Sequence, residues 1–179
     1  MKGIVSLLPE VYTMRVEALW LRLTESHPLA GVRNLPPPHF SWQIGEQADW
    51  WTAKAALQPL AQSTRPLTVR TAGLGFFTGA KPVVFIPVVK NAALLHLHEA
   101  VCARLKSTGV MDDPLYRPEA WMPHITLAVD VTPDAIHPFI NALACEDFAW
   151  EMRVDNLTLL NAPEGRPVCT VWRLPLTGE

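Results

Sequence analysis

The chain contains one short pattern twice, and nearly half of its length separates the two copies. Residues 38–42 read Pro-His-Phe-Ser-Trp and residues 123–127 read Pro-His-Ile-Thr-Leu, so each copy is proline, histidine, apolar, hydroxyl, apolar. The two histidines, His39 and His124, are 85 positions apart in a chain of 179 residues. A repeat at this spacing favours a fold that is built from two copies of one unit.

The hydrophobic pattern continues the repeat beyond the motif. Apolar residues of the same type lie 30 and 35 positions after each histidine without a gap (Val69, Val154, Leu74, Leu159). The order in each half is strand, helix, histidine strand, helix and strand. We therefore expect one domain, residues 1–179, made of two pseudo-symmetric lobes that correspond approximately to residues 1–80 and 81–179. The predicted fold class is α+β, with two antiparallel sheets flanked by helices around a central cleft.

Periodicity and turn residues give the expected elements. Strands are expected at 3–8, 39–44, 67–77, 83–89, 124–129, 150–160 and 168–176, and helices at 10–26, 50–59, 91–105 and 132–143.

Details of all four of these helices are open to test. We expect the first helix to bury Val11, Met14, Ala18 and Leu21, which recur at helical spacing, and the second to end near Pro59. Asn91 should cap the third, which should bury Leu94, Leu97, Val101 and Leu105. In the fourth, Thr132 should act as the cap before Pro133, with Ile136, Phe139, Ile140 and Leu143 buried.

Composition limits the class of protein. Hydrophobic residues make up 49% of the chain and charged residues 18%, which excludes extensive disorder. The net charge is −2, so no overall positive field attracts long nucleic acid. No apolar run is long enough for a membrane helix, and the three cysteines form no metal-binding or disulfide pattern. We expect a cytoplasmic monomer with no membrane association and no cofactor.

Each motif places a histidine and a hydroxyl on one face of a strand, because side chains alternate between faces. His39 and Ser41 should share one face, and His124 and Thr126 should do the same. Two imidazoles in one cleft are suited to phosphoryl transfer, with one accepting a proton and the other donating one near neutral pH. The hydroxyls can donate hydrogen bonds to phosphate oxygens.

At these residues the chain resembles the 2H phosphoesterase superfamily, in particular its 2′-5′ RNA ligase-like proteins. That superfamily is defined by two copies of His-x-Thr/Ser-x, which HFSW (39–42) and HITL (124–127) both match. The resemblance implies metal-independent chemistry on 2′,3′-cyclic phosphates or 2′-5′ phosphodiester bonds of nucleotides or RNA ends. It implies that His39 and His124 are the catalytic acid–base pair, in an order left open, and that Ser41 and Thr126 bind the phosphate.

Many members of that superfamily carry an arginine shortly after the second motif, where this chain has Val129. The missing charge favours a small nucleotide or cyclic phosphate over long RNA as substrate. Aromatic residues near the motifs are candidates for stacking on a base or for packing in the core, and nearby cations are candidate phosphate contacts (Phe76, Phe77, Tyr116, Trp121, Arg117, Lys81).

Two other functions stay open from the sequence. A non-catalytic module could bind a nucleotide or phosphate in the same cleft. A metallohydrolase could use His96 and His98, but residues two apart on a helix point in different directions and do not chelate one ion.

Overall fold

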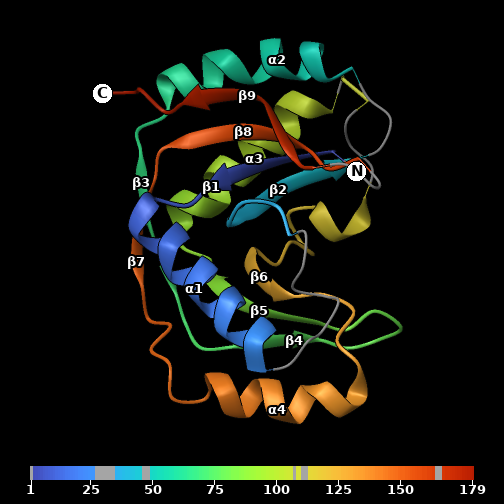
Figure 1. Cartoon of the computed structure of the whole chain (residues 1–179). Helices are drawn as coiled ribbons and strands as arrows, with labels where there is room; N and C mark the ends of the chain where they lie inside the picture. Colours follow the sequence, from blue (N-terminus) through green and yellow to red (C-terminus); the bar gives the residue numbers. More distant parts are fainter. Residues whose placement is uncertain (1, 27–34, 46–48, 107, 110–112, 164–166) are drawn as a thin grey trace.

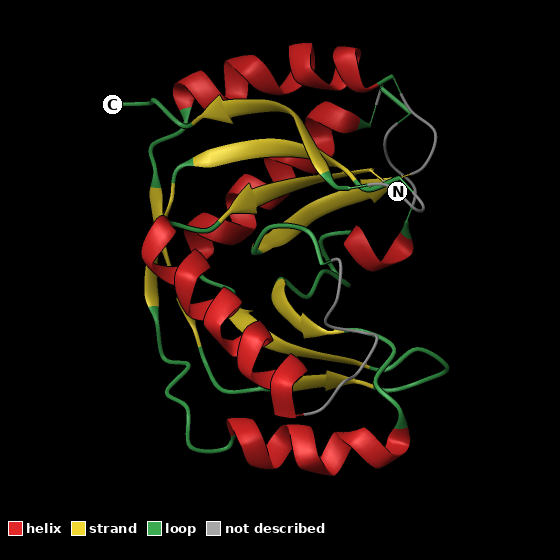
Figure 2. Cartoon of the chain, in the orientation of Figure 1, coloured by secondary structure: helices red, strands yellow, loops and turns green. Residues whose placement is uncertain are grey.

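The computed structural model describes residues 2–26, 35–45, 49–106, 108–109, 113–163 and 167–179. Two antiparallel sheets lie one above the other, with helices on their outer sides and across the front (Figures 1 and 2). The α+β fold class predicted from the repeat is confirmed.

The first sheet carries the first motif strand at its edge. Its order is β2 (His39–Gly45), β1 (Lys2–Leu7), β8 (Asn156–Asn161) and β9 (Cys169–Pro175), with every neighbouring pair antiparallel. β1 is apolar and buried along its middle, as expected for a strand between two others.

The second sheet carries the second motif strand in the equivalent place. β6 (His124–Ala128) pairs with one edge of β5 (Val83–Val89), and β3 (Leu67–Thr71) and β4 (Gly75–Phe77) pair with successive parts of β5. β7 (Glu151–Val154) pairs with β3.

β3 and β4 replace the single strand that the sequence predicted over 67–77. Residues 72–74 separate β3 from β4. On β5, only residues 86–87 separate Val88, which pairs with the end of β3, from Phe85, which pairs with the start of β4. The extra residue is a bulge, and Gly73 supplies its left-handed backbone with φ of 62°. The predicted strand over 150–160 is also divided, but for another reason: β7 and β8, on either side of Asp155, belong to different sheets, where β7 pairs with β3 and β8 pairs with β1 and β9.

The two sheets do not follow the two halves of the sequence. β8 belongs to the second half but pairs with β1, and β3 and β4 belong to the first half but pair with β5. The helices are exchanged too, because α1 (Glu10–Ser26) contacts β6 and α3 (Ala92–Leu105) contacts β2. Each lobe is therefore assembled from both halves. The element order does recur in each half, and the duplication itself stays a prediction.

α2 and α4 each depart from the predicted details. α2 (Trp50–Ser63) continues through Pro59 because the buried Ala61 packs its last turn against the core. α4 (Pro133–Leu143) begins with Pro133 at its first turn, as predicted, but the side chain of Thr132 makes no capping hydrogen bond. In the same helix Ile140 is 44% exposed rather than buried. Asn91 does cap α3 and accepts from the amide of Leu94.

The predicted buried face of α1 is wrong. Val11, Met14, Ala18 and Leu21 are exposed, and the helix instead buries Val16, Leu19 and Leu23. The helix has apolar residues on two sides, and the side that meets the second sheet is buried.

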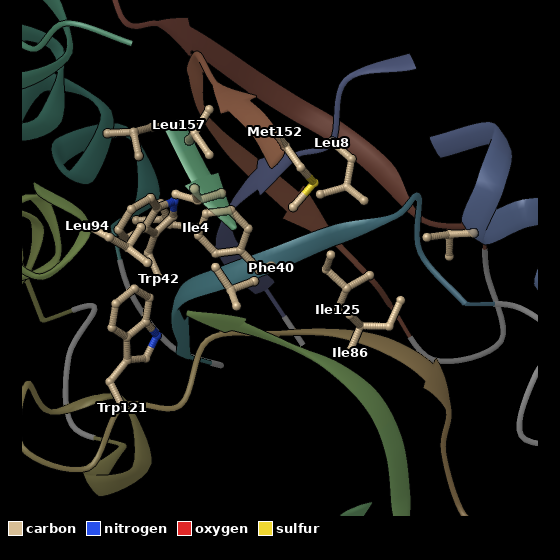
Figure 3. Close-up of a cluster of buried hydrophobic side chains, with 14 of the residues drawn as sticks. Ile4, Leu8, Phe40, Trp42, Ile86, Leu94, Trp121, Ile125, Met152 and Leu157 are labelled. Carbon is tan, nitrogen blue, oxygen red and sulfur yellow. The ribbon is translucent and has the colours of Figure 1, made fainter. Parts of the chain in front are cut away.

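The core runs without a break between the lobes. Phe40 and Trp42 from β2, Ile125 from β6 and Trp121 from the segment before β6 belong to one buried cluster (Figure 3). The inner faces of both motif strands are therefore fixed by the same core.

Candidate active site

The two motif strands meet where the lobes meet. β2 and β6 are edge strands of their sheets and contact each other (Figure 1). In β2 the side chains of Phe40 and Trp42 are buried, whereas His39 and Ser41 are half-buried on the opposite face.

β6 shows the same alternation. Ile125 and Leu127 are buried, and His124 and Thr126 are half-buried on the other face. The arrangement is the one that the period of two predicts for a strand with one face in the core.

One cavity of about 300 Å³ brings the four motif side chains together. His39, Ser41, His124 and Thr126 all line it. The other polar group in its wall is Tyr116, and the remaining described lining residues are apolar (Trp20, Leu35, Pro36, Pro38, Ile44, Val129, Ala162, Val168). Among the described lining residues, therefore, the polar groups are two imidazoles and three hydroxyls.

Both histidines are oriented by the same local hydrogen bond. Nδ1 of His39 lies 2.7 Å from the carbonyl oxygen of Pro37, and Nδ1 of His124 lies 2.7 Å from that of Met122. A carbonyl oxygen only accepts, so the proton is on Nδ1 in each neutral ring. Nε2 of each ring is then the atom that can accept or deliver a proton during a reaction.

The surroundings favour the neutral form of both rings. Burial lowers the pKa of His39 below the ordinary 6.5; the Pro37 hydrogen bond opposes this, and the charge of His124 lowers the pKa further. Burial also lowers the pKa of His124, against the opposing hydrogen bond to Met122. The effect of the His124 charge on His39 agrees with two imidazoles that share one site.

Tyr116 extends the polar part of the cavity. It lies in a short 3₁₀ turn, Pro114–Tyr116, and its half-buried side chain lines the same cavity as Ser41. Burial, with a smaller effect from Asp113, raises the pKa of Tyr116 to about 12, so the phenol stays protonated and available as a donor. Of the aromatic residues proposed as substrate contacts, Tyr116 is the one that lines the cavity.

The other proposed contacts lie elsewhere. Trp121 is only 1% exposed and belongs to the core cluster, so of the two roles left open for it, packing in the core is the one that the structure shows. Phe77 meets the edge of the His124 ring at 5.0 Å between centroids, and Phe76 packs against the core. Arg117 and Lys81 are exposed and are not among the residues that line the cavity.

Sequence reasoning missed most of the apolar wall. Trp20 reaches the cavity from α1, a helix whose buried face was predicted incorrectly, and Ile44 and Val168 come from separate strands or their ends. No local pattern links these residues, because only the packing of the two lobes brings them together.

The two histidines considered as metal ligands, His96 and His98, do not lie on the same side of α3. His96 is exposed and His98 is fully buried, so the two rings lie on different sides of the helix. Within the ranges that the structure describes, no group of three or more His, Cys, Asp or Glu could hold a metal ion. Cys102, Cys145 and Cys169 are free thiols. None of the described helices is both long and apolar enough to cross a bilayer.

Solved structures support the fold assignment. TT0787 of Thermus thermophilus aligns with a TM-score of 0.70 and 23% identity, covering 99% of this chain and 98% of that protein. Escherichia coli LigT complexed with 3′-AMP aligns with a TM-score of 0.66 and 21% identity, covering 98% and 97%.

Sequence comparison connects the chain with phosphoesterases. A Bacillus cytotoxicus protein named "Putative phosphoesterase" is 28% identical over 130 residues, which cover 70% of this chain and 71% of that protein. The model of the 2′-5′ RNA ligase superfamily matches residues 9–166. The resemblance that was based on the two motifs is thereby confirmed, and a phosphoesterase type of enzyme is indicated. The chain belongs to the 2′-5′ RNA ligase superfamily, one of the 2H phosphoesterases.

Proposed function

We propose that this protein is a metal-independent phosphoesterase that opens 2′,3′-cyclic phosphates or cleaves 2′-5′ phosphodiester bonds of nucleotides or RNA ends. One observation carries the proposal. Two imidazoles line the same cavity, and each has its Nδ1 bonded to a backbone carbonyl, which leaves both Nε2 atoms available for proton transfer.

In hydrolysis of a cyclic phosphate, one neutral imidazole accepts a proton from water as the water oxygen bonds to phosphorus. The bond from phosphorus to one ribose oxygen breaks, and the other histidine, as imidazolium, protonates that oxygen. Whether His39 or His124 is the base depends on how the substrate is placed. Ser41, Thr126 and Tyr116 are suited to donating hydrogen bonds to the non-bridging oxygens, where negative charge must be stabilised.

The volume and the lining of the cavity favour a small substrate. A volume of about 300 Å³ is at the lower end of small-molecule sites, and the apolar wall suits a base or another ring. Related structures contain E. coli LigT with 3′-AMP or NADP+ and Kluyveromyces marxianus Usb1 with uridine monophosphate. A cytoplasmic monomer acting on nucleotides or RNA ends, without long nucleic acid, remains our expectation.

The test measures hydrolysis of the four 2′,3′-cyclic mononucleotides and a 2′-5′ dinucleotide, with and without EDTA. We expect activity that EDTA does not reduce, and a fall of at least about 100-fold in kcat for His39→Ala and for His124→Ala. His96→Ala, at an exposed histidine outside the cavity, is the matched control. Full activity in both motif variants would overturn the acid–base assignment.

The same assay separates catalysis from binding. If nucleotides bind tightly to the wild type but none is turned over, the alternative of a non-catalytic binding module is supported instead. Loss of activity in EDTA that zinc or magnesium restores would exclude the metal-independent mechanism.

A further inference from the structure

Trp121 contacts both motif segments although it lies outside the cavity. Its indole Nε1 donates to the backbone oxygen of Ser41 at 2.9 Å, across 80 positions of sequence. Its own backbone is three residues before His124, and the intervening Met122 supplies the carbonyl that orients the His124 ring. One side chain therefore connects the strand of the first motif to the segment that leads into the second.

The polar atoms of Trp121 are all engaged. Its backbone amide donates to the carbonyl of Arg117 at 2.8 Å, and its carbonyl accepts from Nζ of Lys90 at 3.0 Å. Together with the bond to Ser41, these contacts hold the residue at both ends. A buried group with every hydrogen bond made has one favoured position, because displacement would leave polar atoms unpaired.

Two rings fix the plane of the indole. The His98 ring lies parallel to it at 3.8 Å between centroids and an angle of 7°, and Trp42 lies at 5.4 Å and 21°. Nε2 of His98 is 3.3 Å from the carbonyl oxygen of Trp42, which ties α3 to the first motif strand. Figure 3 shows the Trp121 and Trp42 side chains next to each other in the buried cluster.

This arrangement is present on one side only. The position 85 residues before Trp121 is Pro36, which lines the cavity and has no side-chain N–H to donate to the other motif strand. The connection between the motif segments through Trp121 thus has no counterpart at the equivalent position.

We propose that Trp121 is a positioning residue, which holds the Ser41 backbone and the segment before His124 at the separation that the two-imidazole reaction needs. The inference rests on the proposed function and adds a residue to it. It predicts that the loss of the indole N–H disturbs the reaction more than it disturbs substrate binding, because the residue touches no substrate.

Trp121→Phe is the decisive variant, since it keeps an aromatic ring beside His98 and removes the bond to Ser41. The matched control is Trp172→Phe, which removes another buried indole N–H, bonded to the carbonyl of Trp50 at 3.3 Å. We expect kcat to fall about 10- to 100-fold in Trp121→Phe with KM changed less than about threefold, and kcat to stay near wild type in the control. Melting temperatures of both variants are measured alongside.

A second readout does not depend on turnover. The imidazole NMR signals of His39 and His124 are titrated in each variant, and we expect their midpoints to shift in Trp121→Phe but not in Trp172→Phe. If Trp121→Phe does not fold, Lys90→Met carries the test, because it removes the bond to the Trp121 carbonyl and leaves the indole in place; a kcat reduced at least about threefold is then expected.

The outcomes are distinct. Unchanged kcat and unchanged titrations in Trp121→Phe, or in Lys90→Met if that variant is needed, would overturn the inference and leave the proposed function intact. Full activity in both motif histidine variants would overturn the proposed function, and the titrations would still decide whether Trp121 positions the two rings.

Discussion

His39 and His124 make the same hydrogen bond, from Nδ1 to the carbonyl oxygen two residues earlier, at 2.7 Å in both cases. Because both rings are oriented in the same way, geometry alone gives neither of them the role of acid or base. The difference lies in their surroundings. The pKa of His39 is lowered by burial and also by the charge of His124, whereas burial is the lowering effect at His124.

The first prediction concerns the pH dependence of activity. The reactive form has one neutral and one protonated imidazole, and both pKa values lie below the ordinary 6.5. The population of this form therefore rises as pH falls toward the two lowered values. We expect a bell-shaped profile of kcat/KM with its maximum below pH 6.5. A maximum above pH 7 would contradict the lowered pKa values.

A second prediction assigns substrate binding to Trp20. Its ring lines the cavity from α1, and its buried Nε1 has no hydrogen-bond partner among the residues that the structure describes. We expect Trp20→Leu to raise KM for cyclic nucleotides about 10-fold or more, as loss of base stacking does. Ribose 2′,3′-cyclic phosphate, which has no base, should show little change. Trp51→Leu, at an exposed tryptophan on α2, is the control. An equal rise in KM with and without the base would exclude stacking.

A third prediction adds a charge to the cavity wall. Val129 lines the cavity, so Val129→Arg would place a cation near the bound phosphate. We expect KM for a cyclic nucleotide to fall severalfold at low salt and to rise more steeply with salt than in wild type, because ions screen the new attraction. Val89→Arg adds the same charge at an exposed site and should change neither value. A KM that is independent of salt in Val129→Arg would contradict the placement.

The fourth prediction concerns stability in acid. Burial lowers the pKa of His98 to about 4, whereas the unfolded chain protonates near 6.5. Between these values the unfolded state binds more protons, so the free energy of unfolding decreases as pH falls, by about 3 kcal/mol from this residue alone. His98→Phe should make the urea unfolding free energy less dependent on pH between 6.5 and 4. His96→Gln is the control, and an unchanged pH dependence in His98→Phe would contradict the prediction.

Local patterns predicted the outward faces of the motif strands and the buried face of α3. The alternation in β2 involves residues next to each other in sequence, and the structure shows it, with Phe40 and Trp42 buried. Leu94, Leu97 and Val101 likewise form one stripe on α3, and all are buried as expected from their spacing.

Relationships between distant segments could not be predicted. α1 has two apolar stripes, and which one is buried depends on a sheet formed much later in the chain, so Val11 and Leu21 were assigned to the wrong side. Trp121 is an aromatic residue near a motif by sequence, and only its bond to Ser41 shows that it belongs behind the site rather than in it.

The exchange of strands between the halves also has a consequence during synthesis. Lys2 pairs with Asn161 and Val5 pairs with Thr158, so the first strand finds one of its two neighbours only after the ribosome has passed residue 161. Until then the apolar Ile4 and Val5 have an unfilled edge beside them. Contacts this distant in sequence slow folding, and an emerging chain with an open apolar edge is a natural client for chaperones.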